Sequence, residues 1–217
     1  MLLIGNYPPP YGGVPRVIEN LSAFLAERGW AVHVLSGGRT GVERRGQITI
    51  HKLSLAAKLP LLARHAVPLL GAPIGIRVRS ARDAVLRAWY QVLASVGREI
   101  VLRHRIDVIC GFNLSRGGLI GTALGRDRKI PVVVNSFGEL ISDAAFFHAN
   151  PDLLKLICAS ASRLVSGSRH CAETFGRFGL TPTVEVIPYG VDAARFRPDV
   201  DGRDLRRAVG AAAGDPV

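Results

Sequence analysis

Two adjacent glycines, Gly12 and Gly13, lie where an apolar strand (Leu2 to Gly5) and a proline-rich loop lead into a helix. Backbone without side chains can approach a ligand closely, and the N–H groups at a helix N-terminus favour an anion such as a diphosphate. The loop is not GxGxxG, so the dinucleotide-binding fingerprint is absent and a simple turn is the alternative interpretation. The glycine pair therefore predicts an anion-binding site but does not identify the anion.

The elements around the glycines form a β-loop-α-β unit. Pro15 suits a first helical turn and Gly29 suits a left-handed C-cap, while the apolar residues between them fall on one helical face. A second strand begins at Ala31. Farther along, short apolar segments alternate with helical ones, which predicts an α/β fold: a Rossmann-like parallel sheet with helices on both faces.

The other expected elements are defined by their patterns. The charged stretch after Gly37 and Gly38 predicts a turn, and 54–76 predicts short helices or an ordered excursion. Strands are expected at 47–53, 107–111, 131–135, around 164–166 and at 184–187. Helices are expected at 80–103, across 119–124, at 168–178 and at 204–209.

Positive charge is concentrated in one quarter of the chain. The net charge is +11, and residues 52–105 carry ten Lys or Arg against Asp83 and Glu99, which is +8. This concentration predicts a surface for an anionic partner such as a membrane headgroup or a phosphorylated acceptor. Nucleic acid is disfavoured because no binding module is visible. The alternative is simple compositional bias, since the chain has 24 Arg and 4 Lys.

Three cysteines without CxxC or Cys/His spacing, Cys110, Cys158 and Cys171, argue against a disulfide framework and against a metal site. We expect a cytoplasmic protein without a signal peptide, because Met1 leads straight into the first strand. The apolar stretch 53–76 contains charges and three prolines, so a spanning helix is disfavoured.

Two segments resemble GT-B glycosyltransferases of the retaining family 4. The first is NYPPPYGGVPRVIENLSAFLAERGWAVHVLS, which is similar to the family's opening. The second is SRLVSGSRHCAETFGRFGLTPTVEVIPYGVDAARFRPD, which resembles the end of its N-terminal domain, with an I-P-x-G-V-D segment at Ile187 to Asp192. The resemblance implies that 1–190 is a Rossmann-like acceptor-side domain. It also implies that 191–217, whose composition is that of a linker, leads into a C-terminal donor-binding domain that the chain lacks.

The resemblance also implies site residues. Gly12 and Gly13 would close over the diphosphate of a nucleotide-sugar, with Arg16 adding charge, and no metal or cofactor is expected. Acceptor or sugar contacts are expected at the carboxyl ends of strands: Asn113, Ser115, Ser136, Phe137 and Ser168. Ser168 also suits an N-cap.

Two positions depart from the family's pattern. Phe137 stands where members commonly carry a histidine, and phenylalanine can neither hydrogen-bond a sugar hydroxyl nor accept a proton. Glu139 is the nearest titratable group and is the candidate catalytic residue; capping of the next helix is its alternative role. Tyr189 stands where many relatives have asparagine.

The resulting interpretation is the N-terminal half of a retaining glycosyltransferase. It would transfer a sugar from a nucleotide-sugar to a hydroxyl of a glycolipid or polysaccharide precursor, as a peripheral protein on the inner face of the cell membrane, and the isolated chain would be nearly inactive. Two rivals stay open: a GT-B-like nucleotide-sugar epimerase, and a non-catalytic binding or scaffold protein derived from a glycosyltransferase.

Overall fold

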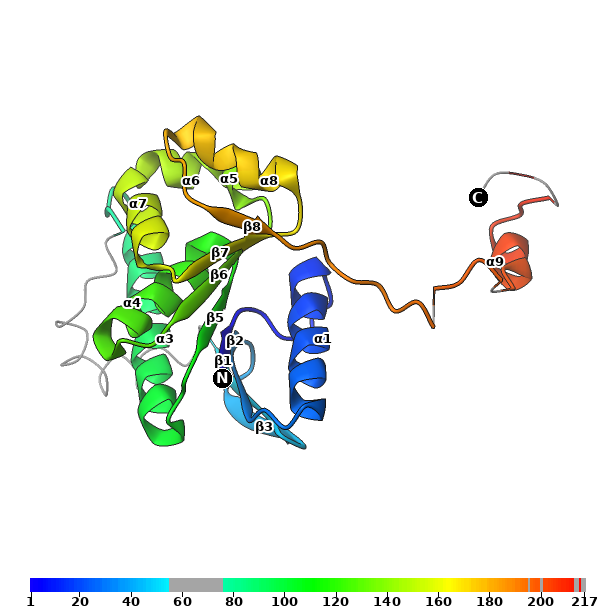
Figure 1. Cartoon of the computed structure of the whole chain (residues 1–217), viewed down its shortest axis with the longest axis horizontal. Coiled ribbons are helices and arrows are strands. Elements are labelled where there is room, and N and C mark those ends of the chain that lie inside the picture. The colour runs from blue at the N-terminus through cyan, green and yellow to red at the C-terminus, as the bar shows by residue number, and fades with distance from the viewer. Residues whose placement is uncertain (55–75, 195, 200, 213–214, 216–217) are drawn as a thin grey trace.

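The computed structural model describes residues 1–54, 76–194, 196–199, 201–212 and 215. Within them one eight-stranded sheet forms the centre, in the order β3-β4-β2-β1-β5-β6-β7-β8 (Figure 1). The strands are β1 (Leu2–Ile4), β2 (Val32–Gly37), β3 (Gly41–Arg45), β4 (Ile48–Leu53), β5 (Ile109–Phe112), β6 (Val132–Ser136), β7 (Arg163–Ser166) and β8 (Val184–Val186). The longer helices are α1 (Gly13–Glu27), α3 (Ala81–His104), α4 (Leu119–Arg128) and α7 (Pro151–Ser160). The shorter ones are the π-helix η3 (Asn113–Gly118), α5 (Glu139–Ser142), α6 (Ala144–Ala149), α8 (Arg169–Glu173), the 3₁₀-helix η4 (Thr174–Phe178) and α9 (Arg203–Ala208).

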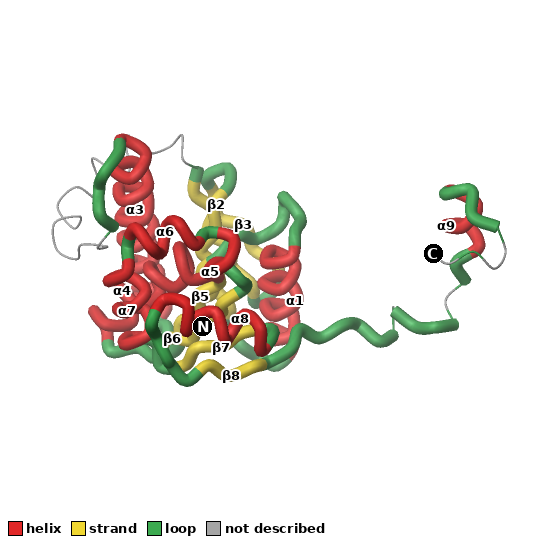
Figure 2. The backbone as a smooth tube through the Cα atoms, turned by 90° about the horizontal axis from the view of Figure 1, so that it is seen from above, coloured by secondary structure: helices red, strands yellow, loops and turns green. Residues whose placement is uncertain are grey.

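All strand pairs are parallel except β3 with β4. This confirms the α/β class and the Rossmann-like parallel sheet. The central strands are short and apolar because both faces of the sheet are covered. Helix α1 covers one face around the fully buried Ile18, whereas α3, α4 and α7 cover the other (Figures 1 and 2).

The charged stretch after Gly38 was predicted to be a turn, and that prediction is wrong. Residues Gly41–Arg45 form β3, which pairs antiparallel with β4 through a turn at Gly46, whose φ is +58°. Charged side chains are compatible with this edge strand because they point to solvent and discourage pairing with another sheet. Glu43 also forms ion pairs with Arg45 and with Lys52 on β4.

Three predicted helices differ in detail from the observed ones. Helix α3 spans Ala81–His104, and Ser80 is its N-cap because its hydroxyl accepts the N–H of Asp83. The helix expected at 168–178 is split into α8 and the 3₁₀-helix η4. The helix across 119–124 is extended at its N-terminal end by the π-helix η3, which the sequence did not reveal. The excursion predicted over 54–76 falls almost wholly outside the described residues.

After β8 the chain leaves the sheet as an extended segment and reaches α9 (Figure 1). The side chains of 187–192 are exposed, including Ile187 and Val191, which are 53% and 70% exposed. The boundary near residue 190 and the linker role of 191–217 remain predictions.

Candidate functional site

The loops that follow the parallel strands meet at one edge of the sheet, which we call the carboxyl edge. The glycine loop follows β1, η3 follows β5, and Phe137 to Glu139 follow β6. Ser168 follows β7 and Tyr189 follows β8. Because β1, β5, β6, β7 and β8 are consecutive neighbours in the sheet, all the residues predicted for the site lie along this edge.

The glycine loop presents an uncapped helix N-terminus. Helix α1 begins at Gly13 with Gly12 as its N-cap, without a side-chain cap and without an acidic residue in its first turn. A Cβ atom built on Gly13 would meet no heavy atom within 4 Å. First-turn N–H groups without a side-chain partner and with open space in front of them suit an anion. Arg16 is half exposed and pairs with Glu19 at 2.5 Å, while its guanidinium lies over the Tyr11 ring.

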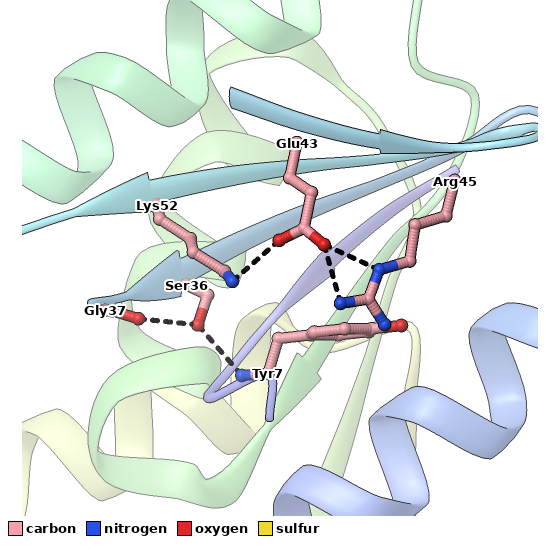
Figure 3. A network of polar contacts seen from close by, with 6 residues as sticks. All are labelled: Tyr7, Ser36, Gly37, Glu43, Arg45 and Lys52. Atoms are coloured by element: carbon pink, nitrogen blue, oxygen red, sulfur yellow. Dashed lines mark hydrogen bonds and ion pairs between the residues drawn. The ribbon is translucent and has the colours of Figure 1, made fainter. Parts of the chain in front are cut away.

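A polar network fixes the start of this loop (Figure 3). The N–H of Tyr7 donates to Ser36 Oγ at 2.8 Å, and Ser36 Oγ donates to the carbonyl of Gly37 at 2.9 Å. The Tyr7 ring is buried and lies under the guanidinium of Arg45. The distance from Arg45 Cζ to the centroid of the ring is 5.7 Å. The β3–β4 hairpin, held by Glu43, therefore packs against the base of the glycine loop.

The π-helix η3 is built around Asn113, one of the predicted contact residues. Asn113 adopts φ +67°, and its Oδ1 accepts the N–H groups of Arg116 at 2.9 Å and Gly117 at 3.3 Å. A Cβ on Gly117 would lie 2.4 Å from the backbone of Phe112 and 2.7 Å from the carbonyl of Ile4. The turn can therefore sit directly on β1 and β5 only with glycine at this position.

A cavity of about 490 Å³ lies beside η3 and α3. It contains two of the predicted contact residues, Asn113 and Ser115. The cavity is lined by Asn6, Arg82, Val85, Leu86, Trp89, Tyr90, Asn113, Ser115 and Arg116.

The arginine that sequence reasoning missed is Arg116. Its guanidinium donates to Oδ1 of Asn6, which ties the loop after β1 to the loop after β5. Burial lowers the pKa of Arg116 and raises the pKa of neighbouring Tyr90. The available signal was an arginine four residues after the end of a buried strand, in NLSRGG, where the glycine pair marks a close backbone approach.

Glu139 is buried at the start of α5, with 7% of its surface exposed. Its Oε2 accepts the N–H of Phe137 at 2.9 Å and the hydroxyl of buried Ser136 at 3.3 Å. Its Oε1 is buried and accepts no hydrogen bond from the described residues. Burial raises the pKa of Glu139, and nearby backbone N–H groups and Ser136 oppose that shift. A carboxyl group with a raised pKa at a strand end is a candidate for proton transfer.

The two positions that depart from the family's pattern lie against each other. The rings of Phe137 and Tyr189 stack with centroids 5.3 Å apart and an interplanar angle of 4°, and Phe112 contacts Phe137 from β5. A Cβ on Gly167 would lie 2.3 Å from the Tyr189 ring, so this glycine leaves the space that the ring occupies. Burial and the charge of Glu139 raise the pKa of Tyr189 to about 12, so it stays a neutral phenol.

Ser168 is the N-cap of α8, and its hydroxyl accepts the N–H of Cys171 at 3.2 Å. This is the local role that its position before a helix favoured. The hydroxyl remains at the carboxyl edge, one strand away from Ser136.

Comparison with known proteins identifies the family. The model of glycosyltransferase family 4 matches residues 11–195. The chain belongs to glycosyltransferase family 4. The family 4 chain also matches crystal structures of Anabaena HepE: the complex with UDP and glucose at 13% identity and a TM-score of 0.61, and the complex with UDP-glucose at 17% and 0.59. Each match covers 96% of this chain and 50% or 49% of the HepE chain, so the family 4 chain spans about half of HepE. A comparison with curated proteins finds no significant match.

The basic surface predicted for residues 52–105 lies only partly within the residues that the structure describes. Lys52, Arg77 and Arg98 pair with acidic residues, whereas Lys58 and Arg64 lie outside the described residues. Among the described residues no helix is long and apolar enough to cross a membrane.

Proposed function

We propose that this family 4 chain is the acceptor-side half of a retaining glycosyltransferase. The complete enzyme transfers a sugar from a nucleotide-sugar to a hydroxyl of a glycolipid or polysaccharide precursor. The observation that carries the proposal is the carboxyl edge itself. There an uncapped helix N-terminus and a cavity lined in part by Asn113, Ser115 and Arg116 lie on adjacent strands of a family 4 fold. That HepE binds UDP-glucose supports a nucleotide-sugar as the donor.

The two parts of the edge have different roles. The N–H groups at Gly13 and Val14 stabilise the negative charge that grows on the departing diphosphate, which is electrostatic catalysis by fixed backbone dipoles. The cavity with Arg116, Asn113 and Tyr90 receives the acceptor, because a partly buried guanidinium beside amide and phenol groups suits a hydroxylated or phosphorylated glycan. Basic groups of the 52–105 region face the membrane or the phosphate of the acceptor, at the inner face of the cell membrane.

Glu139 has a proton-transfer or positioning role in this proposal. Its unpaired Oε1 and raised pKa support a carboxyl that exchanges a proton, while its bonds to Ser136 and Phe137 hold it in place. Phe137 provides packing against Tyr189 and contributes no polar group. If Glu139 does not replace the usual histidine, the favoured alternative is a non-catalytic binding protein.

The test is the reading frame beyond codon 217 and the activity of its complete product. We expect the frame to continue into a donor-binding domain, and the complete protein to transfer sugar from a nucleotide-sugar, measured by mass spectrometry of the products. The 217-residue chain alone should show turnover at least 100-fold lower. Full turnover by residues 1–217 alone would contradict the two-domain proposal. Conversion of the donor without any acceptor, to another nucleotide-sugar, would instead establish the epimerase.

A further inference from the structure

Three histidines converge near the other edge of the sheet, around the start of β2 and the end of α3. His33 is the second residue of β2, His51 lies on β4, and His104 ends α3. They are half of the chain's six histidines, although they are separated by 17 and by 52 residues. The parallel pairing of β2 with β4 brings the first two together, and α3 brings the third.

The geometry of this cluster is that of a partly assembled metal site. His33 Nδ1 lies 3.1 Å from His51 Nε2, and one ring nitrogen from each of the three residues lies within 4.8 Å of the others. Tetrahedral coordination at bond lengths of about 2.0–2.1 Å places ligand nitrogens about 3.3 Å apart. The first pair already meets that spacing. Only His104 must approach. It is exposed at the end of its helix, and its ring stacks on that of His33 with centroids 4.1 Å apart, so coordination requires it to rotate out of this stack.

Neutral imidazole is the ligand form for zinc, copper and nickel, so three converging imidazoles suit an ion of this class.

A cavity of about 300 Å³ adjoins the cluster and gives access to it. His33 and His104 line it, as do the N-terminal residue Met1 and Asp107. Asp107 is the acidic residue among the described residues of that lining, which also includes Arg28 and Arg105. Three imidazoles with a cavity beside them leave a fourth coordination position for water or another small ligand.

We propose that His33, His51 and His104 bind one divalent transition-metal ion of the Zn²⁺ type, with the fourth position facing this cavity. The ion links the hydrogen-bonded strands β2 and β4 to the end of α3. The site lies at the opposite edge from the proposed sugar-transfer site and does not depend on it. The strand length from His33 to Gly37 alone separates the two edges by about 13 Å.

The experiment titrates Zn²⁺ into the untagged 217-residue chain at pH 7 by calorimetry and follows thermal unfolding. We expect one Zn²⁺ per chain, an increase in Tm with Zn²⁺, and the visible absorption of four-coordinate Co²⁺ when cobalt replaces zinc. His104→Ala should weaken binding at least tenfold and abolish the Tm increase. It should leave the fold unchanged by circular dichroism, because the side chain is exposed and alanine favours a helix. His51→Ala should weaken binding similarly.

The matched control is His148→Ala. This histidine is exposed, stacks on Phe178 and is remote from the cluster in the fold, so its loss should leave Zn²⁺ affinity unchanged. Substoichiometric binding would overturn the proposal, as would equal affinities in wild type and His104→Ala or equal losses in His104→Ala and His148→Ala. In those cases His33 and His51 are simply a buried pair in which one imidazole donates a hydrogen bond to the other.

Discussion

The carboxyl edge of the sheet differs from the opposite edge, where the parallel strands begin and which we call the amino edge. The two edges use their polar residues differently. At the carboxyl edge the side chains of Asn113, Ser168 and Glu139 satisfy local backbone groups, which shapes loops whose N–H groups and cavity remain available. At the amino edge three imidazoles from regular elements meet directly. Loops that are held by their own side chains suit large ligands, whereas side chains on rigid strands suit a small ion.

The strongest way to break the carboxyl edge is Gly117→Ala. The added methyl group would lie 2.4 Å from backbone atoms of Phe112, which cannot move without disturbing β5. We expect the free energy of unfolding to fall by about 3 kcal/mol, measured by urea denaturation. Gly176→Ala is the control, because a Cβ there meets nothing within 4 Å, and it should change stability by less than about 0.5 kcal/mol. Equal stabilities for the two variants would show that η3 can shift away from the strand.

The next largest effect is expected on activity, from Gly13→Val. A Cβ at Gly13 meets nothing in the folded chain, so the variant should fold normally, yet the larger side chain would occupy the space proposed for the diphosphate. In the complete protein we expect sugar transfer to fall at least 100-fold with an unchanged Tm. Gly41→Val, which also adds a side chain in open space but on β3, should retain activity. Retained activity in Gly13→Val would remove this loop from the site.

The two edges also differ in how well they could be predicted from the sequence. Gly12, Gly13, Asn113 and Ser168 follow apolar strands, and the ends of parallel strands meet in space, so their grouping was predictable. Phe137 and Tyr189 could each be recognised as a departure, but their stacking could not, because it depends on how the chain after β8 crosses the edge.

The histidine cluster carried no local signal at all. His33, His51 and His104 have no metal-ligand spacing, and their meeting requires the register of β2 on β4 and the length of α3. Strand β3 was missed for a related reason, since its stability comes from pairing with β4 and from ion pairs of Glu43, while its composition is that of a turn. Arg116 was missed because the π-helix that directs it into the cavity is set by close backbone contacts at Gly117.

A smaller effect is expected from Arg116→Met, which removes the positive charge from the cavity and keeps most of the side-chain volume. We expect transfer to the acceptor to fall about tenfold, because one charge-assisted contact is lost. Slow hydrolysis of the nucleotide-sugar by water should be unchanged, since the proposal places the acceptor, and not the donor, in this cavity. Arg98→Met is the control, because Arg98 is half exposed, pairs with Asp127 of α4 and does not line the cavity. If Arg116→Met lowered hydrolysis and transfer equally, the cavity would belong to the donor site.

The smallest expected effect, from Glu139→Gln, tests how the two edges hold titratable groups. Burial disfavours the charged form at both edges, so it raises the pKa of the Glu139 carboxyl and lowers the pKa of the His33 imidazole. For Glu139 the folded chain binds the proton more tightly than the unfolded chain does. Its contribution to stability therefore falls as the pH rises from the ordinary value of 4.5 through the raised one.

Glu139→Gln keeps the shape and an acceptor for the Phe137 N–H, but cannot become charged. Relative to wild type, the variant should gain about 1 kcal/mol at pH 8, and this gain should disappear as the pH falls below about 4. Urea denaturation across that pH range measures the difference, with exposed Glu27→Gln as the control for the loss of a negative charge. A difference that does not change with pH would mean that folding leaves the pKa of Glu139 unshifted. The carboxyl would then lack the raised pKa on which its proposed role at the carboxyl edge rests.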